Sequence, residues 1–220
     1  MRVPKMFLGV IGVLTGVSVV AVVVAVGAAA HTLAAPNLIK NGGADLGPAV
    51  SDASSVVSTI PNWTRTGSFT VVKYGAPGGF PDAAVSQTIG GKTNFFAGGP
   101  SNPKSGATQV VNVTRYKAAI DAGKRTATLS GFLGGYSSQA DALGVSATFL
   151  SATGQTLGVL KIGPVSATQR NNMTTLLPKS ASKLVPKTTR SILVKLTAAR
   201  TSGSYNDGYA DSLALKLAGS

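Results

Sequence analysis

The feature that most constrains this sequence is a set of short segments in which apolar and polar residues alternate. In the segment 143–150 every second residue is apolar, and these residues are Leu143, Val145, Ala147 and Phe149. Successive side chains of a β-strand point to opposite faces, so the pattern predicts a strand with one buried face. The segments 192–196 and 213–217 repeat it. The sequence therefore predicts an all-β fold.

Weaker strand candidates and turn residues complete a predicted sandwich. Short apolar runs predict further strands at 69–74, 108–113, 126–132, 157–162 and 173–177. Segments rich in Gly, Pro and Asn predict the turns between strands, at 75–79, 98–103, 134–135 and 206–208. About eight or nine strands at this spacing are typical of a β-sandwich or jelly roll. The single helix candidate is Tyr116 to Ala122.

The N-terminus carries a segment typical of export. Arg2 and Lys5 precede Met6 to Ala30, which contains no charged residue, and small residues precede possible cleavage sites at His31 and Pro36. As a helix of about 1.5 Å per residue, this uncharged segment is also long enough to span the roughly 30 Å hydrocarbon core of a membrane, so an uncleaved anchor is the alternative.

Two regions follow from this reading. Residues 1–35 are predicted to be a signal peptide or a membrane-anchor helix, and residues 36–220 a single domain. The domain is expected outside the cell or at the cell surface, held to the membrane through the N-terminal helix if the leader is not cleaved.

The predicted domain is strongly basic. Without Arg2 and Lys5 it keeps 18 basic and 7 acidic residues, a formal net charge of +11. Outside a cell, such a charge favours anionic wall polymers or lipid head groups. Nucleic acid is not expected as a partner, because the basic residues are scattered and no recognition helix or RNA-binding motif is present. The densest basic stretch, Lys179 to Arg190, is predicted to be a loop that either binds a partner or keeps the protein soluble.

The residue types of common catalytic sites are missing from the predicted domain. There is no cysteine and no glutamate, and the one histidine, His31, lies beside the possible cleavage sites. This excludes Ser-His-Asp sites, Cys-His pairs and ordinary zinc sites. A glycosidase pair among the seven aspartates is the remaining enzymatic alternative, but most of them stand beside Gly, Asn or Ser, where aspartate serves turns. We therefore expect a non-catalytic protein.

Aromatic and polar loop residues are the candidate ligand contacts. The lone tryptophan, Trp63, is expected in the core, because its burial removes a large apolar area from water. Loops at the end of a rigid sandwich carry variable function, so they are the expected place for a bound glycan. The loop residues predicted to contact it are Tyr136, Gln139, Asp141 and Tyr205.

Both ends of the predicted domain resemble galactose-binding-like jelly-roll carbohydrate-binding modules. The segment Asn37-Leu38-Ile39-Lys40-Asn41-Gly42-Gly43-Ala44-Asp45, followed by Pro61-Asn62-Trp63, is similar to their opening, and Tyr209-Ala210-Asp211-Ser212-Leu213-Ala214-Leu215 is similar to their last strand. Asp45 stands where such modules usually have glutamate, and Ser212 replaces their second aspartate. The segments 94–99, 129–136 and 205–211 also resemble uncharacterised exported actinobacterial proteins.

The resemblance implies a jelly-roll β-sandwich that binds a carbohydrate or an anionic wall polymer without catalysing a reaction. The alternative is a structural or protein-interaction domain of the cell envelope, in which the same sandwich contacts another protein. Retention on insoluble polysaccharides would separate these two functions.

A structural calcium ion is expected at Asp45 and Asp211. Along the predicted final strand, Asp211 shares one face with the core leucines, because the residues that alternate onto this face are Tyr209, Asp211, Leu213, Leu215 and Leu217. An unpaired carboxylate there faces a substantial desolvation penalty. Calcium binds carboxylate and carbonyl oxygens, and the turn Asn41-Gly42-Gly43 can supply carbonyls beside Asp45. The resemblance implies the same ion between first and last strands; the alternative is that Asp211 bonds backbone N–H groups or a lysine.

Overall fold

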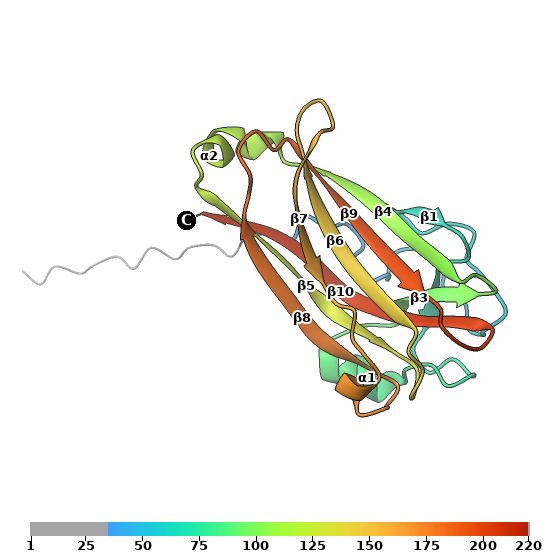
Figure 1. Ribbon diagram of the computed structural model, residues 1–220. Coiled ribbons are helices and arrows are strands. Elements are labelled where there is room, and N and C mark those ends of the chain that lie inside the picture. The colour runs from blue at the N-terminus through green and yellow to red at the C-terminus, as the bar shows by residue number, and fades with distance from the viewer. Residues whose placement is uncertain (1–34, 220) are drawn as a thin grey trace, which may run out of the picture. The chain divides into compact units, whose positions relative to one another are not determined.

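Two antiparallel sheets of five strands each form the part of the chain that the computed structural model describes, residues 35–219. The first, here called the β9 sheet, has the strand order β1-β4-β9-β6-β7 (Figure 1). Its strands are β1 (Thr64–Thr66), β4 (Lys104–Asn112), β9 (Ser191–Ala199), β6 (Ala142–Leu150) and β7 (Thr156–Ile162).

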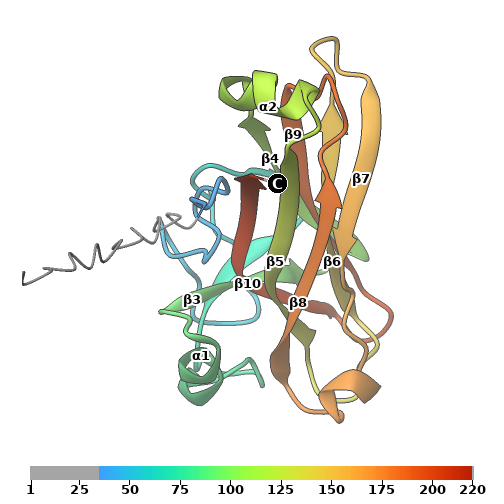
Figure 2. The same cartoon turned by 90° about the vertical axis from the view of Figure 1, so that its left-hand side faces the viewer.

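The second sheet, here called the β10 sheet, has the order β2-β3-β10-β5-β8 and packs face to face with the first (Figure 2). Its strands are β2 (Thr70–Lys73), β3 (Asn94–Pro100), β10 (Tyr205–Gly219), β5 (Arg125–Gly135) and β8 (Thr175–Leu184). The helical segments in the connections are α1 (Ala83–Ile89), α2 (Lys117–Asp121) and the 3-10 turns η1 (Thr114–Tyr116) and η2 (Thr168–Arg170). The predicted β-sandwich is confirmed, and so is the short helix predicted at Tyr116 to Ala122.

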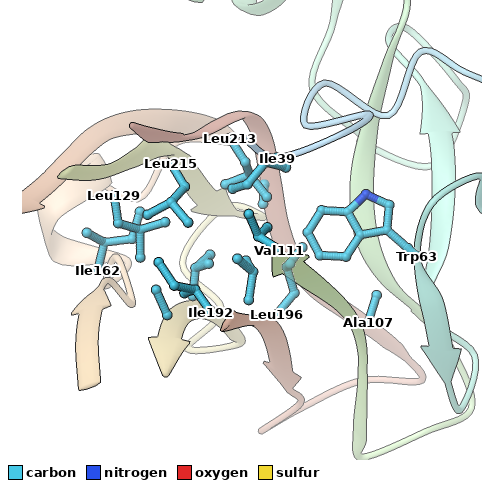
Figure 3. Packing of buried hydrophobic residues seen from close by; sticks show 14 of the residues in the cluster. Ile39, Trp63, Ala107, Val111, Leu129, Ile162, Ile192, Leu196, Leu213 and Leu215 are labelled. Carbon is cyan, nitrogen blue, oxygen red and sulfur yellow. The ribbon is translucent and has the colours of Figure 1, made fainter. Parts of the chain in front are cut away.

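The core lies between the inner faces of the two sheets. Every second side chain of β6 and β9 is buried, which confirms the alternation predicted for both strands. Figure 3 shows Ile192 and Leu196 of the β9 sheet facing Leu129 and Leu215 of the β10 sheet. Full burial of each such side chain contributes about 1.5–3 kcal/mol, and this burial is the main force that holds the sheets together.

Trp63 extends the core at the β1 edge, as predicted. Its side chain is buried in the cluster (Figure 3), and its ring meets the ring of Phe96 edge-on with the centroids 5.6 Å apart. The indole N–H donates to the carbonyl oxygen of Asn41 at 3.1 Å. This bond ties the N-terminal turn of the domain to the β9 sheet.

The last strand changes its face at a β-bulge. The pairing of β10 with β5 shifts between Asp211 and Ala214, and Ser212 has a φ of 51°. One extra residue reverses the alternation, so Leu213 points into the core whereas Tyr209 and Asp211 point out of the opposite face. The predicted parity, which placed Asp211 on the side of the core leucines, is wrong.

A second apolar cluster covers part of the outer face of the β10 sheet. The rings of Phe95 and Tyr209 lie 5.2 Å apart, and Phe80 packs against both. The cover comes from the chain between β2 and β3, which includes α1. The sequence pattern does not predict this helix, because seven residues are too few to show an apolar stripe.

Several segments predicted as loops or turns belong wholly or partly to strands, among them 134–135 at the end of β5 and 98–100 at the end of β3. β8 runs from Thr175 through Pro178 to Leu184, so the first half of the basic stretch is an edge strand. The proline is tolerated because β8 pairs only with β5 and its other edge is free. The Asn-Asp-Gly segment 206–208 is likewise inside β10, at an irregularity in its pairing with β3, and does not form a turn.

The predicted leader, residues 1–35, lies outside the described residues except for Ala35. Within residues 35–219, no helix is both long and apolar enough to cross a membrane. All strand pairs of the sandwich and both apolar clusters fall within this range. The domain therefore contains its own core.

The bulge predicts a restricted position at Ser212. Ser212→Val should lower the free energy of unfolding by about 1–2 kcal/mol, because a β-branched residue is disfavoured at a φ of 51°. Ser130→Val, on the outer face of β5, is the matched control and should change it by less than about 0.5 kcal/mol. Urea denaturation measures both, and equal losses would show that the bulge does not constrain this position.

Candidate functional site

Asp211 is a buried carboxyl group in a polar corner outside the β10 sheet. It is 1% exposed, and the Tyr74 hydroxyl donates to its Oδ2 at 2.7 Å. The backbone N–H of Ser212 donates to its Oδ1, so the alternative that Asp211 bonds a backbone N–H group is confirmed. Burial raises the pKa of Asp211 to about 6, and the nearby Asp45 carboxylate acts in the same direction. Burial and the charge of Asp211 also raise the pKa of Tyr74 well above its ordinary value.

Asp45 and Asp211 converge on two glycine turns. A Cβ atom on Gly43 would lie 2.8 Å from Asp45 Oδ2 and 3.5 Å from Asp211 Oδ1, and one on Gly91 would lie 2.7 Å from Asp211 Oδ2. Asp45 also accepts a hydrogen bond from the backbone N–H of Thr93 at 3.2 Å. The structure thus brings the two predicted metal ligands together, beside a hollow of about 290 Å³ lined in part by Asp45, Gly43 and Gly91.

The chemistry of this corner suits a hard cation such as calcium. Carboxylate and carbonyl oxygens are the ligands calcium prefers, and two carboxylates meet here without an ion pair to any basic side chain of the described chain. Residues 35–219 contain no group of three or more His, Cys, Asp or Glu side chains able to hold a metal ion. Backbone carbonyls or water would therefore have to complete the coordination of Asp45 and Asp211.

The four residues predicted to contact a ligand lie together at one end of the sandwich. Tyr136 packs on Gly79, where the ring leaves no room for a Cβ atom. Tyr205 meets Phe80 edge-on, with the ring centroids 5.2 Å apart. Gln139 donates its backbone N–H to the carbonyl oxygen of Tyr136 at 3.0 Å. Residues 79 and 80 thus contact both Tyr136 and Tyr205, which are far apart in the sequence.

The fourth of these residues, Asp141, holds a loop in place. It is 1% exposed, and its Oδ1 accepts from the backbone N–H groups of Thr201 at 2.6 Å and Ser202 at 3.2 Å. Its Oδ2 accepts from the backbone N–H of Asp207 at 3.0 Å. Backbone donors therefore occupy the Asp141 carboxylate, and ligand contact by the whole group of four stays a prediction.

A buried arginine, Arg170, lies beneath these loops. It is 2% exposed and donates to the carbonyl oxygens of Ser137 at 2.9 Å and Gln139 at 3.1 Å. Burial raises the pKa of the neighbouring Asp207 to about 6, against the opposing effects of the Tyr209 hydroxyl and Arg170. Sequence reasoning missed Arg170, because nothing in its short 3-10 segment marks a buried guanidinium.

The outer face of the β9 sheet is a broad surface without acidic residues. Its five strands contain four basic residues and no aspartate or glutamate. The registers align Lys161 with Ser146, Ser146 with Lys195, and Lys195 with Thr108. These side chains form one row across β7, β6, β9 and β4, here called the lysine row. Lys161 and Lys195 are exposed.

Two shallow hollows lie beside this row, because glycines interrupt the face. Gly144 and Gly106 pair with Thr197 from either side and carry no side chain. Thr197 borders both hollows, one of about 320 Å³ and one of about 210 Å³. The lysines that line them are Lys104, Lys161 and Lys195.

The lysine row offers positive charge and hydrogen-bond donors. Lysine ammonium groups donate only, and serine and threonine hydroxyls both donate and accept. The face therefore suits oxygen acceptors, above all negatively charged ones. Sequence reasoning missed this face because its lysines are far apart along the chain, and only the strand register gathers them.

The raised pKa of Asp207 predicts that stability depends on pH. Its value of about 6 exceeds the ordinary 3.8, so the folded state binds this proton more tightly and the free energy of unfolding falls as pH rises from about 4 to about 6. Asp211, whose pKa is also raised to about 6, contributes a similar decline, so Asp207→Asn should reduce the slope without abolishing it and raise stability at pH 7 by on the order of 2 kcal/mol. Urea denaturation between pH 4 and pH 7 measures the profile.

Asp121→Asn is the contrasting variant. Hydrogen bonds from Arg190 and from the backbone of Thr188 lower the pKa of Asp121, so its stabilising contribution is present above the unfolded pKa and lost as pH falls. This variant should be less stable than the wild type at pH 7 and equal to it in strong acid. An unchanged pH profile in Asp207→Asn would rule out Asp207 as the titrating group.

Comparison with solved structures places the sandwich among known folds. No protein-family model matches the sequence, and a search of curated proteins finds no match. The enzymatically active domain of tailspike protein 4 of bacteriophage CBA120 is similar with a TM-score of 0.51 and 16% identity, over 83% of this chain and 21% of that one. The chain thus spans about a fifth of the tailspike chain, and at this identity the likeness shows a shared fold.

Carbohydrate-binding modules are also among the structural neighbours. TmCBM61, in complex with β-1,4-galactotriose, has a TM-score of 0.46 and 14% identity, over 82% of this chain and 97% of that one. The CBM22-1 xylan-binding domain from Paenibacillus barcinonensis Xyn10C has a TM-score of 0.42 and 12% identity, over 74% of this chain and 89% of that one. The resemblance to exported actinobacterial proteins stays a prediction.

Proposed function

We propose that this chain is an exported, non-catalytic module of the cell surface that binds an acidic carbohydrate or another anionic wall polymer. The outer face of the β9 sheet carries the proposal. Its lysine row and two hollows lie on strands that contain no acidic residue. A surface of this kind attracts polyanions and holds their oxygens with hydroxyl and ammonium donors.

The spacing of the row suits a linear polymer. Lys161 and Lys195 lie on β7 and β9, which are separated by β6. Neighbouring strands are about 4.8 Å apart, so the two backbones are about 10 Å apart. A polymer with negative groups at regular intervals can meet both ammonium groups, while Ser146 between them donates to an intervening oxygen.

The net charge adds long-range attraction to this local fit. A formal charge of +11 on residues 36–220 raises the concentration of a polyanion near the domain without selecting among polymers. Selection of one polymer over another requires the hollows at Gly144 and Gly106, because they give the face its shape. Binding should therefore weaken with added salt but keep a dependence on these residues.

A protein-interaction domain is the second candidate function. The register aligns Val159 with Thr148, Thr148 with Leu193, and Leu193 with Val110, in a row next to the lysine row. Val110 is 65% exposed, so this apolar row is open to a partner. A protein partner would depend on Val110 and Leu193, whereas a polymer would depend on the lysines.

Affinity electrophoresis of residues 36–220 tests the polymer proposal. We expect retardation by polygalacturonate or poly(glycerol phosphate) and little by neutral β-1,4-galactan or xylan. Replacing both Lys161 and Lys195 by Gln should weaken retention on the order of tenfold, if each exposed ionic contact contributes about 0.5–1 kcal/mol. Lys117→Gln with Lys187→Gln, on α2 and in the loop before β9, is the matched control with the same change in charge.

The results separate the two functions. Equal losses in the two double variants would reduce the effect to net charge and reject the lysine row as a site. Retention by neither acidic polymer at modest salt would reject the polymer proposal. If Val110→Ser no longer bound a protein partner but was retained by the polymer as well as the wild type, the result would support the protein-interaction function.

We also propose that the Asp45 and Asp211 corner holds a structural calcium ion. The ion would offset the repulsion between the two carboxylates, which the raised pKa of Asp211 reflects in part. It would also link the N-terminal turn to the last strand. These two segments already lie side by side, because the backbone N–H of Leu213 donates to the carbonyl oxygen of Gly42 at 2.9 Å. Asp45 and Asp211 would be its side-chain ligands, with carbonyl oxygens of the adjacent turns as further ligands.

Chelation tests the calcium proposal. At a calcium concentration tenfold above Kd, binding stabilises the folded state by about 1.4 kcal/mol, so EDTA should lower Tm by a few degrees. Asp211→Asn should abolish this response. Asp207→Asn should keep it, because this buried aspartate lies four residues earlier in β10 and contacts Tyr209 and Asp141 instead of Asp45. A wild-type melting curve that ignores both EDTA and millimolar calcium would reject the ion.

A further inference from the structure

The charged residues are distributed unevenly between the two ends of the sandwich. Segments 113–124, 151–155 and 185–190 connect strands at the end that carries α2 (Figures 1 and 2). The basic residues of this end are Arg115, Lys117, Lys124, Arg125, Lys187 and Arg190. The three segments together with Arg125 are here called the basic end. Two of the seven aspartates, Asp141 and Asp207, are instead buried around the loops of the opposite end.

The basic end carries almost no compensating charge. Asp121 is its one acidic residue, and it forms an ion pair with Arg190 at 2.7 Å. The pair cancels one positive charge and leaves five. Lys117, Lys124 and Lys187 are exposed, so most of this charge faces solvent.

Apolar and aromatic groups accompany the charge. The guanidinium of Arg115 lies 4.7 Å from the centre of the Tyr116 ring, and that of Arg125 lies 5.2 Å from it. Leu184, the last residue of β8, is 55% exposed and pairs with Thr126, next to Arg125. Such a mixture of cations, an aromatic ring and an exposed leucine suits the interface between water and lipid.

The chain also enters the domain near this end. Leu38 bonds the last strand through its backbone N–H, which donates to the carbonyl oxygen of Leu215 at 2.8 Å. Pro36 and Arg115 line the same hollow of about 840 Å³. In the sequence, the uncharged segment Met6 to Ala30 ends shortly before this point.

We infer that the basic end docks on the surface of an anionic lipid bilayer. A bilayer presents a continuous negative surface, which suits charges spread over several projecting loops and does not require a groove. The uncharged segment that precedes the point of chain entry favours a membrane over a soluble polymer as the partner. The basic end is a surface distinct from the lysine row. When this end docks, the outer face of the β9 sheet, which carries the lysine row, stands roughly perpendicular to the membrane.

Vesicle sedimentation with residues 36–220 tests this inference, because this part carries its own core and lacks the uncharged segment. We expect binding to vesicles with 30% phosphatidylglycerol and none to pure phosphatidylcholine at 0.1 M salt. Each basic residue near the surface strengthens binding about fivefold, so Lys117→Gln, Lys124→Gln and Lys187→Gln together should weaken it on the order of a hundredfold.

The matched control replaces Lys104, Lys161 and Lys195 by Gln, with the same change in net charge, and should bind vesicles within about threefold of the wild type. Equal losses in the two triple variants would overturn the inference, and so would a wild-type domain that ignores anionic vesicles. Preferential loss of poly(glycerol phosphate) binding in the basic-end variant, with vesicle binding unchanged, would assign this end to a polymer instead. Thermal melts check that both variants are folded.

Discussion

The hydrogen bonding of β10 on both of its edges is the interaction on which the rest of the domain depends. This strand pairs with β3 on one side and with β5 on the other, and where β3 ends, Leu38 takes its place against Leu215. The bulge at Ser212 lets the same strand supply Leu213 to the main core and Tyr209 to the outer aromatic cluster. One strand therefore anchors both apolar clusters, and the corner at Asp211 exists because of the same irregularity.

The use of acidic residues explains how the surface comes to be so basic. Asp141, Asp207 and Asp211 are buried, where they accept hydrogen bonds from backbone groups or tyrosine hydroxyls. Asp121 is engaged with Arg190. Most of the negative charge of the domain thus serves its internal structure, while nearly all of the lysines face solvent. The lysine row and the basic end are two consequences of this division.

The sequence was enough to predict the sandwich but not its irregularities. Strict alternation marked β6 and β9 because each has one buried face and ordinary pairing throughout. The predicted alternation of β10 is wrong at Ser212. A single residue with positive φ there moves every later side chain to the opposite face, and no residue type in the sequence indicates this change. Pro178 suggested a loop, although the free edge of β8 tolerates it.

The candidate sites were predicted to different degrees for similar reasons. Asp45 and Asp211 were paired through the resemblance of the two chain ends, and the structure brings them together even though the parity argument was wrong. Tyr136 and Tyr205 were grouped by their loop context and lie at the same end. The lysine row could not be predicted, because Lys161 and Lys195 become neighbours of Ser146 only through long-range strand register.

The position of β10 in the chain has a consequence for the order of folding. The strand lies in the middle of its sheet, yet among the described strands it is the last in chain order, Tyr205–Gly219. Until it is available, β3 and β5 have no partner between them, and the apolar faces of both sheets stay incomplete. Closure of the sandwich therefore depends on pairing between strands that are far apart in the sequence, and such long-range pairing makes folding slower than in folds built from local contacts.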